Sequence, residues 1–130
     1  VFGPNLGIIS DVGSSWFVPN LIGRARANGM GLLGDSISSE QAKDWGLIWD
    51  AVSDEELLSK SIEIAERLAN GPIEGLKAIV KAHDNALSVS LNDQLDYERD
   101  TQEILLDKKE FKEGVSAFVG KRKPNFRDLS

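Results

Sequence analysis

The carboxylate of Asp11 is the side chain of this sequence best suited to moving a proton. It lies in the segment Ser10-Asp11-Val12-Gly13, which is typical of a turn that leads into a helix. Apolar neighbours such as Ile9 and Trp16 would keep water from the carboxylate, which suits a base that must also return the proton. The alternative is structural, because an Asp directly before a helix is a common N-cap. The spacing alone leaves both roles open.

The other side chains with chemical potential have simpler explanations. His83 has no acidic or Ser partner at a useful spacing, so we interpret it as a solvated helix residue. We interpret Trp16, Trp45, Trp49 and Phe118 as core or subunit-interface anchors. We expect one acidic cluster to be a solvated helical face without a metal site: Asp93, Asp96, Glu98, Asp100 and Glu103. The absence of Cys removes thiolate nucleophiles and zinc-thiolate sites.

Composition narrows the class of protein. The chain has 130 residues, 41% of them apolar, which is normal for one domain that buries its own core. The net charge of −6 argues against nucleic-acid binding, and no apolar run approaches the ~20 residues that span a bilayer. The absence of Cys fits a reducing compartment, so we expect a cytoplasmic protein. The abrupt start at Val1-Phe2-Gly3-Pro4 indicates a piece of a longer protein.

Helices are expected along most of the chain, so the predicted fold class is mostly α. Caps, glycines and apolar stripes place them at about residues 14–22, 24–33, 39–45, 53–69, 73–87, 90–106 and 109–121. Pro19 should bend the first of these or end its first part. Residues 6–9 could be a strand end or an extended loop, and Leu47 to Val52 is the best strand candidate. Gly29 and Gly31 would allow close packing of another backbone.

Several segments resemble, in order, the crotonase (enoyl-CoA hydratase/isomerase) superfamily. The resemblance is carried by Leu6 to Pro19 with Leu21-Ile22-Gly23-Arg24-Ala25, by Leu32 to Asp35, by Ser38 to Ala42, by Trp45 to Trp49, by Gln94 to Asp100 and by Glu113 to Phe118. The stretches Trp45 to Trp49 and Gln94 to Asp100 look like the ring-1,2-epoxyphenylacetyl-CoA isomerase branch in particular.

The resemblance implies an α/β parent with a ββα-spiral core, of which this chain is the C-terminal half. Residues 1–52 would be the end of the spiral core. Residues 53–130 would be the helical region through which the family forms homo-oligomers, either trimers or dimers of trimers. The two backbone donors of the family's oxyanion hole would lie before Val1, so none is expected in this chain.

The resemblance also implies an acyl-CoA thioester substrate, with coenzyme A as part of the substrate and no separate cofactor. Asp11 matches the catalytic Asp of the isomerase branches. Gly3 stands where the hydratase branch and the simple enoyl isomerases carry a catalytic Glu, which favours isomerisation by a single Asp and leaves an enoyl-CoA hydratase as the alternative. Lys121 matches a basic residue that meets the CoA phosphates of a neighbouring subunit, although cations at a helix C-terminus also offset its dipole. The chain alone should be inactive, and a non-catalytic helical oligomerisation module is the remaining hypothesis.

The matched turn also departs from the family pattern. Ser10 stands where Pro is usual, Ser14 and Ser15 replace small glycines, and Asn20 replaces the usual Arg. We therefore expect the turn around Asp11 to differ in shape from that of its relatives.

Overall fold

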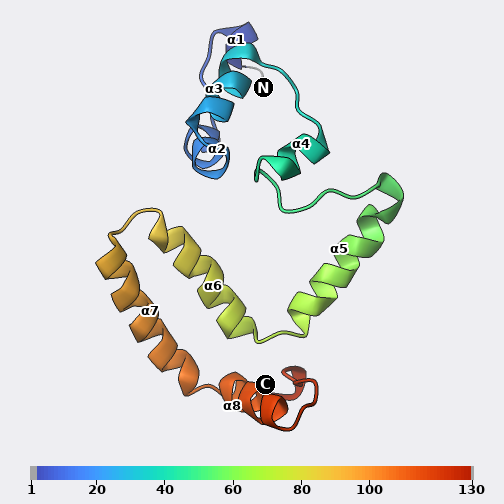
Figure 1. The fold of residues 1–130 in the computed structure, drawn as a ribbon, viewed down its shortest axis with the longest axis vertical. Helices are drawn as coiled ribbons and strands as arrows, with labels where there is room; N and C mark the ends of the chain where they lie inside the picture. Colours follow the sequence, from blue (N-terminus) through green and yellow to red (C-terminus); the bar gives the residue numbers. More distant parts are fainter. Residues whose placement is uncertain (1–2, 130) are drawn as a thin grey trace. The chain divides into compact units, whose positions relative to one another are not determined.

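The computed structural model describes residues 3–129 and contains helices joined by short loops (Figure 1). The helices are α1 (Gly3–Leu6), α2 (Ser14–Ile22), α3 (Arg24–Leu33), α4 (Ser39–Asp44), α5 (Asp54–Ala69), α6 (Ile73–Ala86), α7 (Leu91–Leu106), α8 (Lys109–Val119) and the 3₁₀ helix η1 (Arg127–Leu129). Residues 3–129 contain no strand. The prediction of a mostly α chain is confirmed.

Local hydrogen bonds explain where the helices begin. The Ser38 hydroxyl accepts a hydrogen bond from the backbone N–H of Gln41 at 3.1 Å, and the Ser90 hydroxyl accepts one from that of Asp93 at 3.2 Å. Each serine satisfies a donor that has no partner in the first helical turn. These caps were visible in the sequence, and the predicted starts of α4 and α7 agree with the structure to within a residue.

The strand predicted for Leu47 to Val52 is wrong. Gly46 adopts a left-handed conformation with φ 79°, and the N–H of Leu47 turns back to donate to the carbonyl of Ala42 at 2.8 Å. This bond and one from Gly46 to Lys43 (2.9 Å) close α4 in a Schellman motif. Leu47, the first residue of the predicted strand, therefore belongs to the C-terminal end of α4.

The N-terminal stretch also differs from expectation. Leu6 belongs to α1, a short helix that the sequence did not predict, and residues 8–11 form an extended loop without strand pairing. The loop alternative is therefore correct only from residue 8 onward. Helix α2, in contrast, has the predicted bounds and continues through Pro19 to Ile22.

The chain divides into two compact units, residues 1–56 and 57–130. In the first unit, α3 packs against α1 and α2. In the second, α6 packs against α7 and α7 against α8. The roles predicted for residues 1–52 and 53–130 stay predictions.

A buried glutamine ties α6 to α7 near the turn that joins them. The Gln94 side chain is 9% exposed, donates to the carbonyl of Ala82 at 3.1 Å and accepts from the Asn85 amide at 2.9 Å. A buried amide is tolerated when its donors and acceptors are paired in this way. The two helices are thus joined by a buried polar contact.

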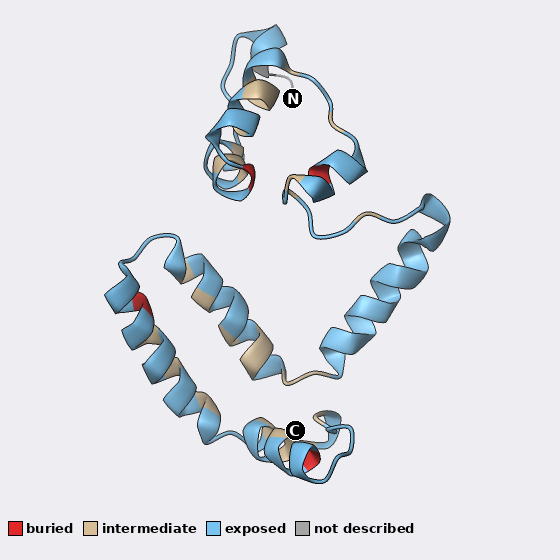
Figure 2. Ribbon diagram, in the orientation of Figure 1, coloured by how far each residue is buried: buried red, intermediate tan, exposed pale blue. Residues whose placement is uncertain are grey.

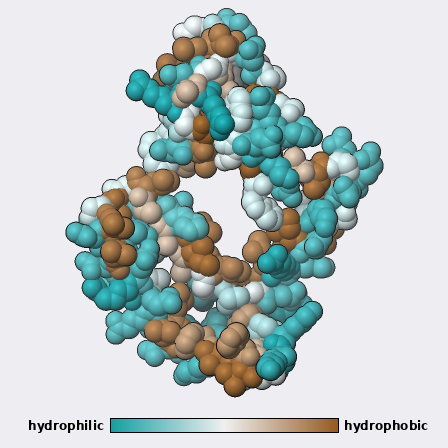
Figure 3. All heavy atoms as spheres, viewed as in Figure 1, coloured by the Kyte–Doolittle hydropathy of each residue, from teal (hydrophilic) through white to brown (hydrophobic). Residues whose placement is uncertain are grey.

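Most of the described residues are exposed (Figure 2), and many large apolar residues are among them. Buried apolar residues are Ile22, Ala42 and Ala117. The accessible surface is 10387 Å², whereas two separate globular units of this total mass would expose about 8,000 Å². Figure 3 shows apolar residues gathered on the surface, including a patch over α8. The expectation of a domain that buries its own core is wrong, because most large apolar side chains of residues 3–129 stay exposed.

Glycines 29 and 31 lie in the open within the described chain. A Cβ atom built at either position would meet nothing within 4 Å. The close packing expected at these glycines is therefore not formed by the chain itself.

Candidate functional site

Asp11 lies in a tight turn whose backbone is strained. Val12 has φ 53° and Gly13 has φ 77°, so two consecutive residues are left-handed. This conformation costs a non-Gly residue about 1–2 kcal/mol, and a β-branched residue rarely adopts it. The Val12 side chain is 94% exposed, so no packing within the described chain offsets the cost.

Within residues 3–129, the turn is held by the backbone carbonyl of Asp11 and not by its carboxylate. The carbonyl of Asp11 accepts from the backbone N–H of Ser14 at 3.0 Å and from its hydroxyl at 2.7 Å, while Gly13 is the N-cap of α2 without a side-chain cap bond. The carboxylate itself has no hydrogen-bond or ion-pair partner among residues 3–129. The N-cap alternative for Asp11 is therefore wrong.

Gly13 is required by this geometry. A Cβ atom at this position would lie 3.0 Å from Cε2 of Phe17, and the φ of 77° would strain any other residue. The Phe17 ring makes an edge-on contact with the ring of Trp16, with centroids 5.0 Å apart. Phe17 and Gly13 together fix the path of the chain just after Asp11.

Asp11 borders a hollow of about 550 Å³ between the turn, α2 and α3. This volume is in the range of small-molecule sites. The hollow has an apolar part and a polar part, and its lining includes Ile8, Ile9, Val18, Leu32, Ser14, Ser15 and Asn28. Asp11 is exposed, so the desolvation expected from its apolar neighbours is not provided by the described residues. The arrangement presents a free carboxylate to a ligand-sized, partly apolar space.

Lys121 also lies at a strained backbone position. Helix α8 ends at Val119 and not at Lys121 as predicted, because Gly120 is its C-cap and Lys121 turns left-handed with φ 49°. The N–H of Lys121 donates to the carbonyl of Phe118 at 3.2 Å, and that of Arg122 donates to the carbonyl of Ala117 at 3.0 Å. The ammonium group of Lys121 is exposed and has no ion-pair partner within residues 3–129.

Glu113 holds this turn, and sequence reasoning missed it. Its two carboxylate oxygens accept from the Arg122 guanidinium at 2.6 and 2.8 Å, and one of them also accepts from the backbone N–H of Asn125 at 2.7 Å. The hydrogen bonds from Arg122, followed by that from Asn125, lower the pKa of the Glu113 carboxyl to about 2. The same contact raises the pKa of the Arg122 guanidinium. Nine residues separate Glu113 from Arg122, which is no helical contact spacing, so the sequence carried no signal for the pair.

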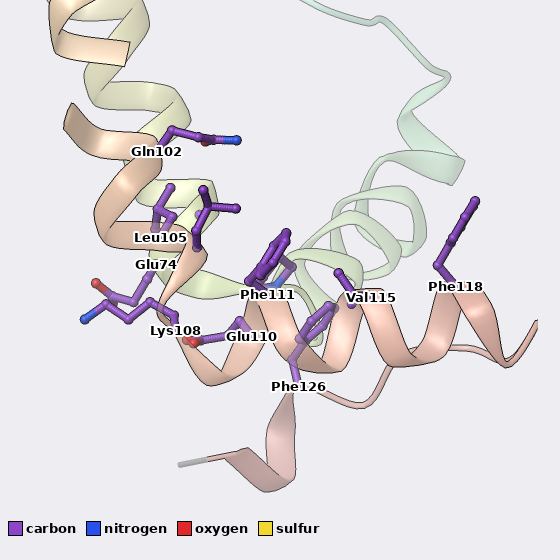
Figure 4. A pocket seen from close by; sticks show the side chains of 13 residues that line it. Glu74, Gln102, Leu105, Lys108, Glu110, Phe111, Val115, Phe118 and Phe126 are labelled. Atoms are coloured by element: carbon purple, nitrogen blue, oxygen red, sulfur yellow. The ribbon is translucent and has the colours of Figure 1, made fainter. Parts of the chain in front are cut away.

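Figure 4 shows a second hollow, of about 410 Å³, in the unit of residues 57–130. Leu105, Phe111, Val115, Phe118 and Phe126 make it largely apolar, and Glu74, Lys108 and Glu110 add charged groups. The side chain of Phe126 points from the C-terminal tail toward α8.

The aromatic residues do not form a core within this chain. Trp49 is 79% and Phe118 86% exposed, whereas Trp45 is half-buried with the Arg26 guanidinium 5.3 Å from its ring centroid. Of the two predicted roles for these aromatics, core or interface, a core within this chain is thus excluded for Trp49 and Phe118.

The remaining predicted site features can be placed directly. His83 is exposed on α6, as predicted. The acidic face of α7 is exposed, and Arg99 pairs with Asp96 and Asp100. Residues 3–129 contain no group of three or more His, Asp or Glu side chains that could hold a metal ion, and no helix in this range could cross a membrane.

A family model supplies the identification. The model for enoyl-CoA hydratase/isomerase matches residues 2–129. The chain belongs to the enoyl-CoA hydratase/isomerase family. The resemblance seen in the sequence is thereby confirmed for nearly the whole chain.

Individual family members support the assignment. The chain is 46% identical to the 1,2-epoxyphenylacetyl-CoA isomerase of Escherichia coli over 93% of its own length and 46% of the relative. It is 40% identical to a probable enoyl-CoA hydratase of Rhodobacter capsulatus over 93% of its length and 47% of the relative. It also matches the crystal structure of an enoyl-CoA hydratase from Bacillus anthracis with a TM-score of 0.86 and 36% identity, covering 95% of this chain and 48% of that one. The chain thus spans about half the length of these relatives.

Proposed function

We propose that this chain is the C-terminal half of an acyl-CoA isomerase of the crotonase type, in which Asp11 moves a proton between carbons of a CoA thioester. The proposal is carried by the free carboxylate of Asp11, which a strained turn holds beside a ligand-sized hollow. Strained backbone positions cluster at functional sites, where the surrounding structure must hold them.

The chemistry needs one carboxylate that works in both directions. The α carbon of a thioester is weakly acidic, and loss of its proton gives an enolate whose oxygen must be stabilised by fixed donors. Asp11 would take the proton from one carbon and return it to another, so that the substrate is rearranged and the carboxylate regenerated. The two oxyanion-hole donors would come from residues outside this chain, and the chain alone would therefore be inactive.

Gly3 favours isomerisation over hydration. Adding water across a double bond typically uses two carboxylates to orient and split the water, and Gly3 has none to offer at the position where hydratases carry the second. An enoyl-CoA hydratase remains the alternative within the family. Turnover in ¹⁸O-labelled water separates the two, because hydration places the label in the product and isomerisation does not.

Replacement of Asp11 by Asn in the complete protein tests the proposal. The variant keeps the shape of the side chain but cannot accept the proton, so turnover of unsaturated and epoxide acyl-CoA substrates should fall about 10²–10⁴-fold. Asp35→Asn is the matched control, because Asp35 is also an exposed loop carboxylate but does not line the hollow. Unchanged turnover in Asp11→Asn would exclude Asp11 as the base.

The exposed apolar faces support a second candidate function, a helical oligomerisation module that pairs with further copies of the chain. Helix α5 has no buried residue, and its side chains Leu57, Leu58 and Ile62 are 57%, 71% and 50% exposed. Apolar surface of this extent usually marks an interface. For the complete protein we propose a homo-oligomer, either a trimer or a dimer of trimers. Sedimentation analysis tests each proposal on its own protein. A well-behaved monomer of this chain would contradict the oligomerisation module, and a monomer of the complete protein would contradict the trimer and the dimer of trimers.

A further inference from the structure

Lys121 occupies a backbone position at which glycine is usual. In a Schellman motif the residue after the C-cap is left-handed, and glycine adopts this conformation without the steric cost that other residues bear. Lys121 adopts it with φ 49°, although its ammonium group contacts nothing in the described chain. The contacts within residues 3–129 do not explain why a lysine stands here.

The turn is held from behind by the side chain of Glu113. The carboxylate is 14% exposed and binds both terminal nitrogens of Arg122, while the Asn125 N–H fills a further acceptor site. Arg122 in turn donates to the Ser116 hydroxyl at 3.2 Å and to the carbonyl of Lys123 at 3.2 Å. These bonds fix the chain on the C-terminal side of Lys121 to helix α8.

The same clamp directs the C-terminal tail back along α8. Phe126 follows Asn125 by one residue, and its ring points toward Val115 on the helix (Figure 4). Lys121 is therefore held on one side by the end of α8 and on the other by a tail that is fixed to the same helix.

We infer that Glu113 is a positioning residue for Lys121: it holds Arg122 and Asn125 so that the Lys121 ammonium is presented to a phosphate group of the CoA moiety. The inference rests on the proposed function, which supplies a CoA thioester as the ligand. Glu113 itself would not touch the ligand and would act only through the turn.

The helix dipole does not account for this arrangement. Any cation near the last carbonyls offsets the dipole, and Arg122 or Lys123 would do so without a left-handed lysine. A specific ligand contact requires a defined position for the ammonium group, and this is what the clamp provides.

The test compares two probes on the complete protein. Butyryl-CoA carries the phosphates and the adenosine, whereas the butyryl thioester of pantetheine carries the same acyl group without any phosphate. Calorimetric titration of both probes should show that Lys121→Ala weakens butyryl-CoA binding about threefold to tenfold and leaves the pantetheine thioester within about twofold. Lys123→Ala, which removes the same charge two residues on, should change neither by more than about twofold.

The decisive variants are at Glu113. Both Glu113→Gln and Glu113→Asp should reproduce the selective loss seen in Lys121→Ala, because neither can hold Arg122 and Asn125 together. Long-range electrostatics predicts the reverse for Glu113→Gln, since removal of a negative charge favours an anionic ligand. Glu113→Asp keeps the net charge and decides the question if Glu113→Gln does not fold.

Three results would overturn the inference, and they can be told apart. Unchanged or tighter butyryl-CoA binding in both Glu113 variants, with a loss in Lys121→Ala, would remove Glu113 and leave the CoA contact. Equal weakening of both probes would show a general structural role for Glu113. No effect of Lys121→Ala would remove the proposed phosphate contact itself.

Discussion

Replacement of Lys121 by Gly should stabilise the protein relative to replacement by Ala. Both variants lose the ammonium group, but only glycine adopts a φ of 49° without steric cost. Relief of the left-handed conformation is worth about 1–2 kcal/mol, and the greater freedom of glycine in the unfolded chain takes back about 0.4–1 kcal/mol. The two ranges differ by about 0–1.6 kcal/mol, and their midpoints make Lys121→Gly more stable than Lys121→Ala by about 0.8 kcal/mol.

Thermal and urea unfolding of the complete protein measure this difference. A protein of 150–250 residues shifts its melting temperature by about 2–4 °C per kcal/mol, so we expect the two variants to differ by about 1–4 °C. Lys112 provides the control, because it lies inside α8, where Gly should be less stable than Ala by about 1 kcal/mol. Opposite signs at the two lysines are expected. If Lys121→Ala matched or exceeded Lys121→Gly in stability, the argument from backbone strain would be refuted.

Three further predictions concern the turn at Asp11, the clamp and one helix cap. Gly13→Ala should destabilise the protein by about 1–3 kcal/mol and lower turnover. The new Cβ atom would lie 3.0 Å from the Phe17 ring, and alanine bears the steric cost of a left-handed conformation that glycine avoids. An equally stable and active variant would contradict this geometry. The stabilisation by the Glu113 carboxylate should be complete above pH 4.5, its ordinary pKa, and lost as the pH falls toward about 2. The difference in urea midpoint between wild type and Glu113→Gln should therefore shrink over that range. A constant difference would exclude the ion pair as its cause. Ser90→Ala should cost about 0.5–2 kcal/mol in urea unfolding because the N–H of Asp93 loses its cap, whereas Ser90→Thr should retain most of the stability.

The helices were predictable because their signals are local. Ser38 and Ser90 cap the next turn of their own helices, so a few neighbouring residues determine where α4 and α7 begin. The strand predicted after Gly46 failed for a related reason. Its apolar pattern fits a strand, but the hydrogen bonds of Gly46 and Leu47 to α4 take the start of the run into a helix C-terminus.

The site was predictable only in part. Residue types in the turn made Asp11 a candidate, the family resemblance made Lys121 one, and the helical spacing showed which faces of the helices are apolar. The sequence could not show that Gly13 and not Asp11 caps α2, because that depends on two consecutive left-handed residues. It could not show Glu113 either, because the carboxylate reaches Arg122 only after the chain has reversed at Lys121.

Backbone strain gives evidence about the two sites that does not depend on the family resemblance. Among residues 3–129, the non-glycine residues with positive φ are Val12 and Lys121. One directly follows the proposed catalytic carboxylate, and the other carries the proposed phosphate contact. Each such position costs about 1–3 kcal/mol and persists only where the surrounding structure holds it. In each turn the charged group itself has no partner in the described chain, and hydrogen bonds hold the neighbouring atoms. Ser14 donates to the carbonyl of Asp11, and Glu113 binds Arg122, which follows Lys121. Glycine at position 121 would remove the strain there, so the left-handed Lys121 is best explained by what its side chain must reach. At the other turn the strained residue is Val12 and not Asp11, so the strain marks the turn that carries the carboxylate but not the carboxylate itself.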